Sequence, residues 1–175
     1  MTPEFSRPRR LDTIGAGDSE MSIAAEPAER AALAVRFGLL ALDRLEARFT
    51  LKRDATGVVA QGHLSADATQ ACVVSGAPVP ATVEEDFTIR FLPQPDSAED
   101  EIELSADECD TVFFTGGAVD LGEAAAETLA LSLDPFPRSP DAEDALREAG
   151  VLSEEEAGPF GALKGLRDKM KGEGA

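Results

Sequence analysis

Residues 112–138 read VFFTGGAVDLGEAAAETLALSLDPFPR and contain, in order, an apolar strand, a turn, a helix and a helix stop. The turn has two adjacent glycines, which permit a positive φ. Asp120 stands at the position of a helix N-cap, and Glu123 follows three residues later, as in a capping box. Pro135 and Pro137 end the helix, because neither ring can donate a backbone hydrogen bond. Both ends of this helix are therefore specified locally.

The helix predicted over residues 120–133 has two different faces. Glu123 and Glu127 lie together on one side, where they can reach water. The opposite side is a broad stripe of small, apolar and hydroxyl side chains, made of Ala124, Ala125, Thr128, Leu129, Leu131, Ser132 and Leu133. We expect this stripe to pack against a sheet.

A second, shorter helix is predicted near the N-terminus. The segment PAERAALAVRFG begins with Pro27 at a permitted first helical position and ends with Gly38 at a C-cap position. Leu33 and Phe37 share its inner face. Before it, residues 1–19 contain prolines and glycines that favour extended or turn structure over helix.

Between the two helices the hydrophobic period becomes two, which is typical of strands. Alternation over 45–52 and 58–64, across the turn residues 54–57, predicts a hairpin. Further strands are expected over 71–74 and 83–91, which gives a four-stranded antiparallel meander with one polar face. A short strand at 102–104 should precede residue 112.

The expected fold class is α+β, with an antiparallel β-sheet of about five to six strands packed by one or two helices. We expect a single domain over residues 1–140, with an acidic surface loop at 93–101. Residues 141–175 should form an acidic and then basic tail that is weakly helical or partly disordered.

The 175-residue chain has a formal net charge of −18, and this charge is unevenly distributed. Residues 1–83 carry −1, residues 84–156 carry −19 and residues 157–175 carry +2. Such an acidic middle repels phosphate backbones and attracts basic partners, or it serves only solubility. With no long apolar segment and no signal-peptide core, we expect a soluble, cytoplasmic protein. Cys72 and Cys109 are then expected to be free thiols, although sequence leaves a bridge between them open.

The run VDLGEAAAETLALSLDPFPRSP, together with CVVSGAPVPATVEEDFTIRF upstream, resembles the YceD family of large ribosomal RNA subunit accumulation proteins. The resemblance rests on the Asp-Leu-Gly-Glu helix start, the Pro-x-Pro-Arg exit and the preceding Cys and Phe-x-x-x-Phe pattern. It implies a bacterial cytosolic factor that supports accumulation of large-subunit (23S) ribosomal RNA in ribosome biogenesis. The family name describes a cellular process and does not state a molecular mechanism.

The resemblance also bears on metal binding. Some relatives have a Cys-x-x-Cys and a later cysteine, a spacing that suits zinc, where this chain has Cys72, Ser75 and Ser139. A hydroxyl is a poor zinc ligand, so we expect no metal here. Cys72 is then a small buried hydrophobe on a strand.

No enzyme class is indicated by the motifs. His63 is the only histidine and falls on the polar face of a predicted strand, and neither Ser65 nor Ser75 has a nucleophile-elbow setting. Dinucleotide and P-loop motifs do not occur. We therefore expect no catalytic residues, no cofactor and no small-molecule substrate.

The expected partner is large-subunit ribosomal RNA or a ribosomal protein. The candidate RNA-binding residues are basic: Arg7, Arg9, Arg10, Arg44, Arg48, Lys52, Arg53, Lys164, Arg167, Lys169 and Lys171. Several of them share one surface if the N-terminal arm lies against the first hairpin. A stacking platform for bases is not evident, because the chain has no Trp or Tyr. Glu127 and Arg138, which lack an obvious folding role, are the candidate protein-partner surface.

Three functions follow as hypotheses. The first is a non-enzymatic factor that binds ribosomal RNA or a precursor particle. The alternative is an acidic adaptor or chaperone for a basic ribosomal protein, motivated by the charge of residues 84–156. The third, an enzyme, is motivated only by the abundance of carboxylates.

Overall fold

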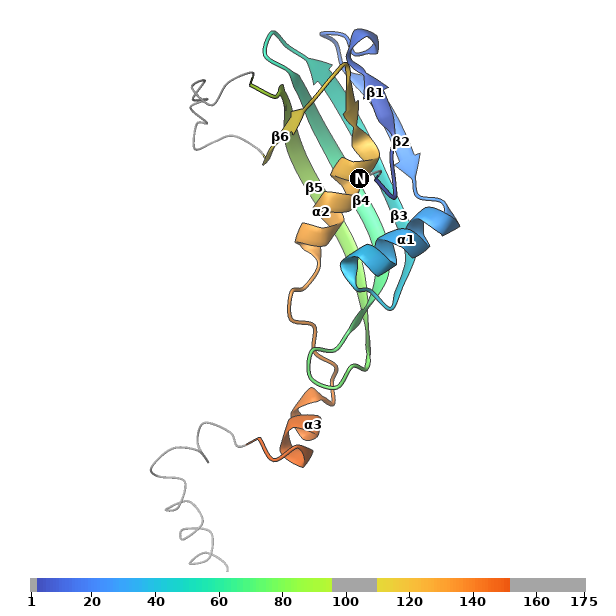
Figure 1. Cartoon of the computed structure of the whole chain (residues 1–175), viewed down its shortest axis with the longest axis vertical. Coiled ribbons are helices and arrows are strands. Elements are labelled where there is room, and N and C mark those ends of the chain that lie inside the picture. Colours follow the sequence, from blue (N-terminus) through green and yellow to red (C-terminus); the bar gives the residue numbers. More distant parts are fainter. Residues whose placement is uncertain (1–2, 96–109, 152–175) are drawn as a thin grey trace, which may run out of the picture. The chain divides into compact units, whose positions relative to one another are not determined.

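We analysed a computed structural model, which describes residues 3–95 and 110–151. Its main sheet has five strands in the order β2-β3-β4-β5-β6 (Figure 1). They are β2 Ser19–Ala24, β3 Ala41–Arg53, β4 Val58–Ala71, β5 Pro78–Pro93 and β6 Asp110–Phe114. The expected α+β class is confirmed.

The chain forms two compact units. The described part of the first contains residues 3–70, 80–95 and 110–135, and that of the second contains residues 71–79 and 136–151. The first unit holds both long helices and most of the sheet.

Most strand pairing is antiparallel, as expected. The pairs β2–β3 and β3–β4 are antiparallel, and side-chain contacts of His63 with Asp86 and of Asp67 with Thr82 follow an antiparallel register between β4 and β5. β6 differs, because it lies parallel to β5, with Ile89 opposite Asp110. The chain crosses from the end of β5 to the start of β6, and such a crossover reverses the sense of pairing that a hairpin would give.

One face of the sheet is covered by helices α1 (Pro27–Phe37) and α2 (Leu121–Ser132) (Figure 1). A small antiparallel ribbon of β1 (Pro8–Arg10) and β7 (Ala118–Asp120) lies on the same side, and η1 (Leu11–Thr13) follows β1. The other face has no covering element among the described residues. The expected polar face is confirmed.

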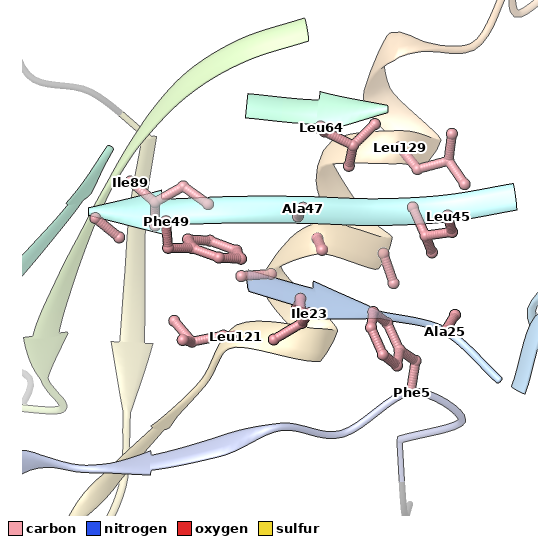
Figure 2. Packing of buried hydrophobic residues seen from close by; sticks show 14 of the residues in the cluster. Phe5, Ile23, Ala25, Leu45, Ala47, Phe49, Leu64, Ile89, Leu121 and Leu129 are labelled. Atoms are coloured by element: carbon pink, nitrogen blue, oxygen red, sulfur yellow. The ribbon is translucent and has the colours of Figure 1, made fainter. Parts of the chain in front are cut away.

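The core lies between the sheet and α2 (Figure 2). Phe49 meets Phe87 edge to face, with ring centroids 5.3 Å apart. Small side chains on α2 let the helix approach the sheet closely, since Ala124 and Ala125 are buried. The expected stripe is confirmed in part: Leu129 is fully buried, but Leu131 is 79% exposed.

The predicted N-cap of α2 is confirmed. The Asp120 carboxylate accepts hydrogen bonds from the backbone N–H groups of Gly122 (3.0 Å) and Glu123 (3.3 Å). The Glu123 carboxylate binds the Arg36 guanidinium of α1 at 2.7 Å. Gly38 ends α1 with a φ of 66°, as its C-cap position predicts.

The described strands differ from the predicted ones in two ways, and one further predicted strand falls on residues that the structure does not describe. The strand predicted over 71–74 is wrong, because β4 runs without a break to Ala71 and Cys72 begins a turn in which its carbonyl accepts the Gly76 N–H. β2 was not expected, and neither were the short strands β1 and β7. The strand expected at 102–104 and most of the 93–101 loop lie outside the described residues.

The second unit contains α3 (Ala142–Glu148), which confirms a short acidic helix after Pro140. The rest of the expected tail, from residue 152 on, lies outside the described residues. In the part of the chain that the structure covers, no helix has the length and apolar character needed to cross a bilayer.

Candidate functional site

The open face of the sheet carries three of the seven predicted basic residues that the structure describes, Arg44, Arg48 and Lys52. Because side chains alternate along a strand, the inner positions of β3 hold Phe49 and Leu51 while Arg48 and Lys52 point to the open side. The same alternation on β4 sends His63 to this side. The result is an uncovered polar surface across the middle of the sheet.

An ion-pair network on this face joins side chains of β3, β4 and β5. Arg44 Nε lies 2.8 Å from Asp67 Oδ2, and Arg44 Nη2 lies 3.1 Å from Glu84 Oε1. Ser65 Oγ donates to Glu84 at 2.6 Å. The hydrogen bond from Arg44 lowers the pKa of Asp67, and that from Ser65 lowers the pKa of Glu84. Arg44 is therefore already matched by two carboxylates.

His63 lies between two carboxylates on the same face. Its Nδ1 is 2.6 Å from Asp86 Oδ1, and its Nε2 is 2.9 Å from Glu84 Oε2. The hydrogen bonds to Asp86 and then to Glu84 raise the pKa of His63 above its usual 6.5. As the sequence predicts, His63 is a surface residue, and the two carboxylates beside it favour the protonated form of its ring.

Arg48 and Lys52 are exposed and, among the residues that the structure describes, make no hydrogen bond or ion pair. Arg48 borders a hollow of about 430 Å³ on the open face. Its polar lining includes Ser22, Thr50 and Gln61. These two cations are thus free to contact a phosphate, although Glu20 and Asp86 also line the hollow.

The N-terminal arm contacts the end of the first hairpin, but β1 lies on the helix side of the sheet (Figure 1) and not on the open face that carries Arg48 and Lys52. Arg53 donates from its backbone N–H to Gly15 O (2.9 Å) and from Nη1 to Leu11 O (2.8 Å). Arg10 pairs with the exposed Asp12 at 2.6 Å. This geometry brings the arm to the end of β3 that carries Lys52 and Arg53.

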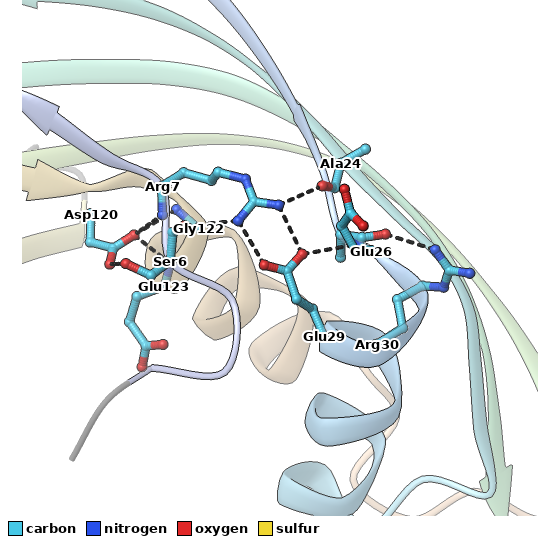
Figure 3. A network of polar contacts seen from close by, with 10 residues as sticks. Ser6, Arg7, Ala24, Glu26, Glu29, Arg30, Asp120, Gly122 and Glu123 are labelled. Carbon is cyan, nitrogen blue, oxygen red and sulfur yellow. Dashed lines mark hydrogen bonds and ion pairs between the residues drawn. The ribbon is translucent and has the colours of Figure 1, made fainter.

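Arg7 has a different environment (Figure 3). Its guanidinium donates to both oxygens of Glu29, at 2.7 and 2.8 Å, and its backbone N–H donates to Asp120 at 2.7 Å. The Arg7 hydrogen bond lowers the pKa of Glu29. Arg7 therefore joins the arm to α1 and α2. Its predicted RNA contact stays a prediction.

Arg9 lies in the β1–β7 ribbon opposite Val119. Its Nε is buried and, among the residues that the structure describes, has no hydrogen-bond partner. The role predicted for Arg9 stays a prediction. The remaining RNA candidates, Lys164, Arg167, Lys169 and Lys171, lie outside the described residues.

Arg36 is a structural residue that sequence reasoning missed. Its guanidinium contacts Glu123 at 2.7 Å and Glu4 at 3.0 Å. The hydrogen bond to Glu123 is the main cause that raises the pKa of Arg36. The opposite charges of Arg36 and Glu123 were visible in the sequence, but their proximity depends on how α1 and α2 pack.

The two candidate protein-partner residues lie in different units. Glu127 is exposed on α2, yet partial burial of its carboxyl group and the charge of Glu123 raise its pKa. Arg138 is exposed in the second unit. Their role as a partner surface stays a prediction.

Cys72, Ser75 and Ser139 come together in the second unit. The two hydroxyl oxygens are 3.2 Å apart, and Cys72 is a buried free thiol, as expected, while Cys109 lies outside the described residues. Hydrogen bonds from the Ser139 hydroxyl and N–H, and then from Ser75, lower the pKa of Cys72 to about 6. One thiolate with two hydroxyls does not fit zinc, which prefers four thiolate, imidazole or carboxylate ligands.

The chain matches a known protein family. The family model described as large ribosomal RNA subunit accumulation protein YceD matches residues 60–167, which is more than half of the chain. No curated protein and no solved structure matches the chain. The matched range includes most of β4 and all of β5, β6 and α2, and it excludes Arg48 and Lys52.

Proposed function

Because the chain belongs to the YceD family, we propose that it supports accumulation of large-subunit ribosomal RNA by binding that RNA or a precursor particle, without catalysing a reaction. The family description supplies the process, and the open face of the sheet supplies a surface for the binding step. The observation that carries the proposal is that Arg48 and Lys52, on that face, make no ion pair with any residue that the structure describes.

The proposed contact is to phosphates rather than to bases. Exposed cations can replace the counterions condensed on RNA, and this exchange makes affinity strongly dependent on salt. No aromatic side chain points outward from β3 or β4, so the part of the open face around Arg48 and Lys52 offers no platform for stacking. The acids around Arg48 limit the contact to a small footprint.

The test compares two double variants. Arg48→Glu with Lys52→Glu should abolish crosslinking of the protein to large-subunit RNA in cells. In binding to the enriched RNA it should also lower the slope of log affinity against log salt by roughly 1.4 to 1.8, as expected for two lost phosphate contacts.

The matched control is Arg138→Glu with Arg147→Glu, which makes the same change in net charge at exposed sites of the second unit. Its crosslinking and salt slope should stay close to those of the unmodified chain. Equal losses in both variants would mean that net charge alone controls binding, and unchanged binding in the first variant would remove the open face from the proposal.

A second candidate function is an acidic adaptor for a basic ribosomal protein. It is favoured by the net charge of −19 on residues 84–156. This reading predicts that the purified chain retains basic ribosomal proteins at low salt. Failure to retain any of them would remove it.

A further inference from the structure

A row of three polar side chains crosses the open face between two cations. Glu20 of β2 is the ladder partner of Thr50 on β3, and Thr50 is the ladder partner of Gln61 on β4. We call Glu20, Thr50 and Gln61 the central row. Because side chains alternate along a strand, Arg48, Thr50 and Lys52 all point to the open side. The central row therefore lies midway between Arg48 and Lys52.

The central row lines the hollow on the open face. All three of its members border the volume of about 430 Å³, together with Ser22, Arg48 and His63. This volume is within the range of about 300 to 1,000 Å³ that is typical of small-ligand sites. The lining comes entirely from β2, β3, β4 and β5, and each of these strands is described from end to end. The shape of the hollow is therefore set by described residues.

The central row has hydrogen-bonding capacity to offer a ligand. The Glu20 carboxylate accepts hydrogen bonds, and the Thr50 hydroxyl and the Gln61 amide can both donate and accept. Among the described residues, none of these three side chains makes a hydrogen bond or an ion pair. Asp86, the other carboxylate of the lining, contacts His63. Within the described part of the chain, Glu20 is thus the carboxylate of the hollow that has no donor.

A carboxylate between two phosphate contacts limits what can bind beside it. Phosphodiester oxygens are negatively charged and have no proton to donate, so Glu20 repels them. A hydroxyl can donate to the carboxylate, and RNA differs from DNA in having a 2′-hydroxyl on each sugar. A sugar–phosphate backbone that follows β3 would bring phosphates to Arg48 and Lys52, about 13 Å apart along the strand, and sugars to the central row.

We propose that the central row binds ribose 2′-hydroxyl groups of an RNA strand, so that the open face distinguishes RNA from DNA. RNA binding by this face is the premise of the inference, which adds the part of the ligand that is recognised. Deoxyribose would place a C–H group against Glu20. A site that bonds a hydroxyl rejects the analogue that lacks it, because its own polar groups are then left unpaired. The preference should not depend on base sequence, since the contacts are to sugar and phosphate.

The test uses the full chain and three single-stranded probes of equal length with the same base: oligouridylate, oligodeoxyuridylate and 2′-O-methyl oligouridylate. Fluorescence anisotropy at low salt measures their dissociation constants. Oligouridylate should bind at least about tenfold more tightly than oligodeoxyuridylate, a factor equivalent to about 1.4 kcal/mol. The 2′-O-methyl probe keeps the 2′ oxygen but has no proton to donate, so it should bind as weakly as the deoxy probe. Equal affinity for oligouridylate and its 2′-O-methyl form would overturn the inference.

Two single variants separate the hydroxyl contact from an effect of charge. Glu20→Ala and Glu46→Ala each remove one exposed carboxylate from the open face, and Glu46 lies outside the hollow. Both should strengthen binding of RNA and DNA alike, because a negative charge is lost. Only Glu20→Ala should also reduce the ratio of RNA affinity to DNA affinity, to within about threefold.

Gln61→Ala should reduce this ratio in the same direction as Glu20→Ala. Circular dichroism and thermal unfolding establish that each variant is folded. A ratio that stays unchanged in Glu20→Ala, or that falls equally in Glu46→Ala, would overturn the inference.

The Arg48→Glu with Lys52→Glu variant separates this inference from the function on which it rests. A preference for oligouridylate in the unmodified chain, with binding of all three probes lost in the variant, would support both. Equal binding of RNA and DNA that the variant abolishes would leave the phosphate contact standing and overturn recognition of the 2′-hydroxyl. Binding of no probe by the unmodified chain, or equal binding by both proteins, would overturn the function and the inference together.

Discussion

Individual side chains in this protein acquire their properties from neighbours that are distant in sequence. His63 meets Asp86 and Glu84 from the adjacent strand, and Cys72 meets Ser139 from beyond α2. The sequence places His63 correctly on the polar face, but it cannot show the carboxylates opposite, because these depend on strand register. Local motifs were more informative, as the N-cap at Asp120 shows.

Gly122 gives a prediction in which packing opposes helix propensity. Alanine inside a helix is normally favoured over glycine by about 1 kcal/mol. A Cβ at Gly122, however, would lie 2.5 Å from Phe5 O and 2.9 Å from Arg7 N. We expect Gly122→Ala to lower the free energy of unfolding by about 1 to 3 kcal/mol, because the backbone of the arm must move. Urea denaturation measures the change.

The control is Gly117→Ala, where an added Cβ meets no atom within 4 Å and φ is not in the positive range. Its free energy of unfolding should change by less than about 0.5 kcal/mol. A stabilised Gly122→Ala protein would show that the arm does not press on the start of α2.

His63 gives a prediction about pH. Its pKa in the folded chain lies above the unfolded value of 6.5 because Asp86 and Glu84 favour the protonated ring. A raised folded pKa stabilises the protein below the unfolded pKa, and this contribution is lost as pH rises through the folded pKa. An NMR titration of the imidazole protons should therefore give a midpoint above 6.5.

Removing either carboxylate tests the cause of that shift. Asp86→Asn should lower the midpoint more than Glu84→Gln does, since the Asp86 hydrogen bond is the larger cause. Asp43→Asn removes a carboxylate of β3 that makes no hydrogen bond or ion pair in the described part of the chain, and it should leave the midpoint unchanged. A midpoint at or below 6.5 in the unmodified protein would contradict the contact geometry.

At the scale of elements, the two long helices and the β3–β4 hairpin could be predicted from sequence because their signals are local. Prolines, a cap and a C-terminal glycine bound the helices, and period-two patterning marks the hairpin. β1 and β7 could not be predicted, since each has three residues and exists only by pairing with the other. The parallel placement of β6 is likewise a property of the crossover that precedes it.

Asp120 connects these elements and supports a prediction about the arm. Its carboxylate caps α2 and also accepts hydrogen bonds from the Ser6 hydroxyl and the Arg7 N–H. Asp120→Ala should cost about 1 to 3 kcal/mol, because the cap and two further hydrogen bonds are lost. It should also increase hydrogen exchange in β1, which pairs with β7.

Asp120→Asn is the matched control. Asparagine caps helices about as well as aspartate, and its carbonyl oxygen can still accept from the arm. It should therefore retain most of the stability and most of the protection of β1. Unchanged exchange in β1 after Asp120→Ala would mean that the β1–β7 pairing holds the arm without the carboxylate.

For the whole molecule, the sequence predicts where along the chain the acidic residues lie, but not which side chains they face in the fold. The acidity of residues 84–156 was plain from composition, but composition could not show that Glu84 faces Arg44 and His63 while Glu85 lines a hollow beside α2. This alternation divides the acids of β5 between an ion-pair network on the open face and the opposite side of the strand.

The net charge of −18 leads to the last prediction, which concerns salt and stability at pH 7. Raising ionic strength from about 0.01 M to about 0.15 M shortens the Debye length from about 30 Å to about 8 Å. Salt then weakens two opposing effects, repulsion among the many carboxylates and attraction within exposed ion pairs such as Arg10 with Asp12. Exposed pairs contribute only about 0 to 1 kcal/mol each, so the loss of repulsion should dominate. The melting temperature should rise with salt, and it should rise less for Asp43→Lys with Glu46→Lys, whose net charge is closer to zero. A melting temperature that falls with salt would mean that the ion pairs on the open face contribute more to stability than their exposure indicates.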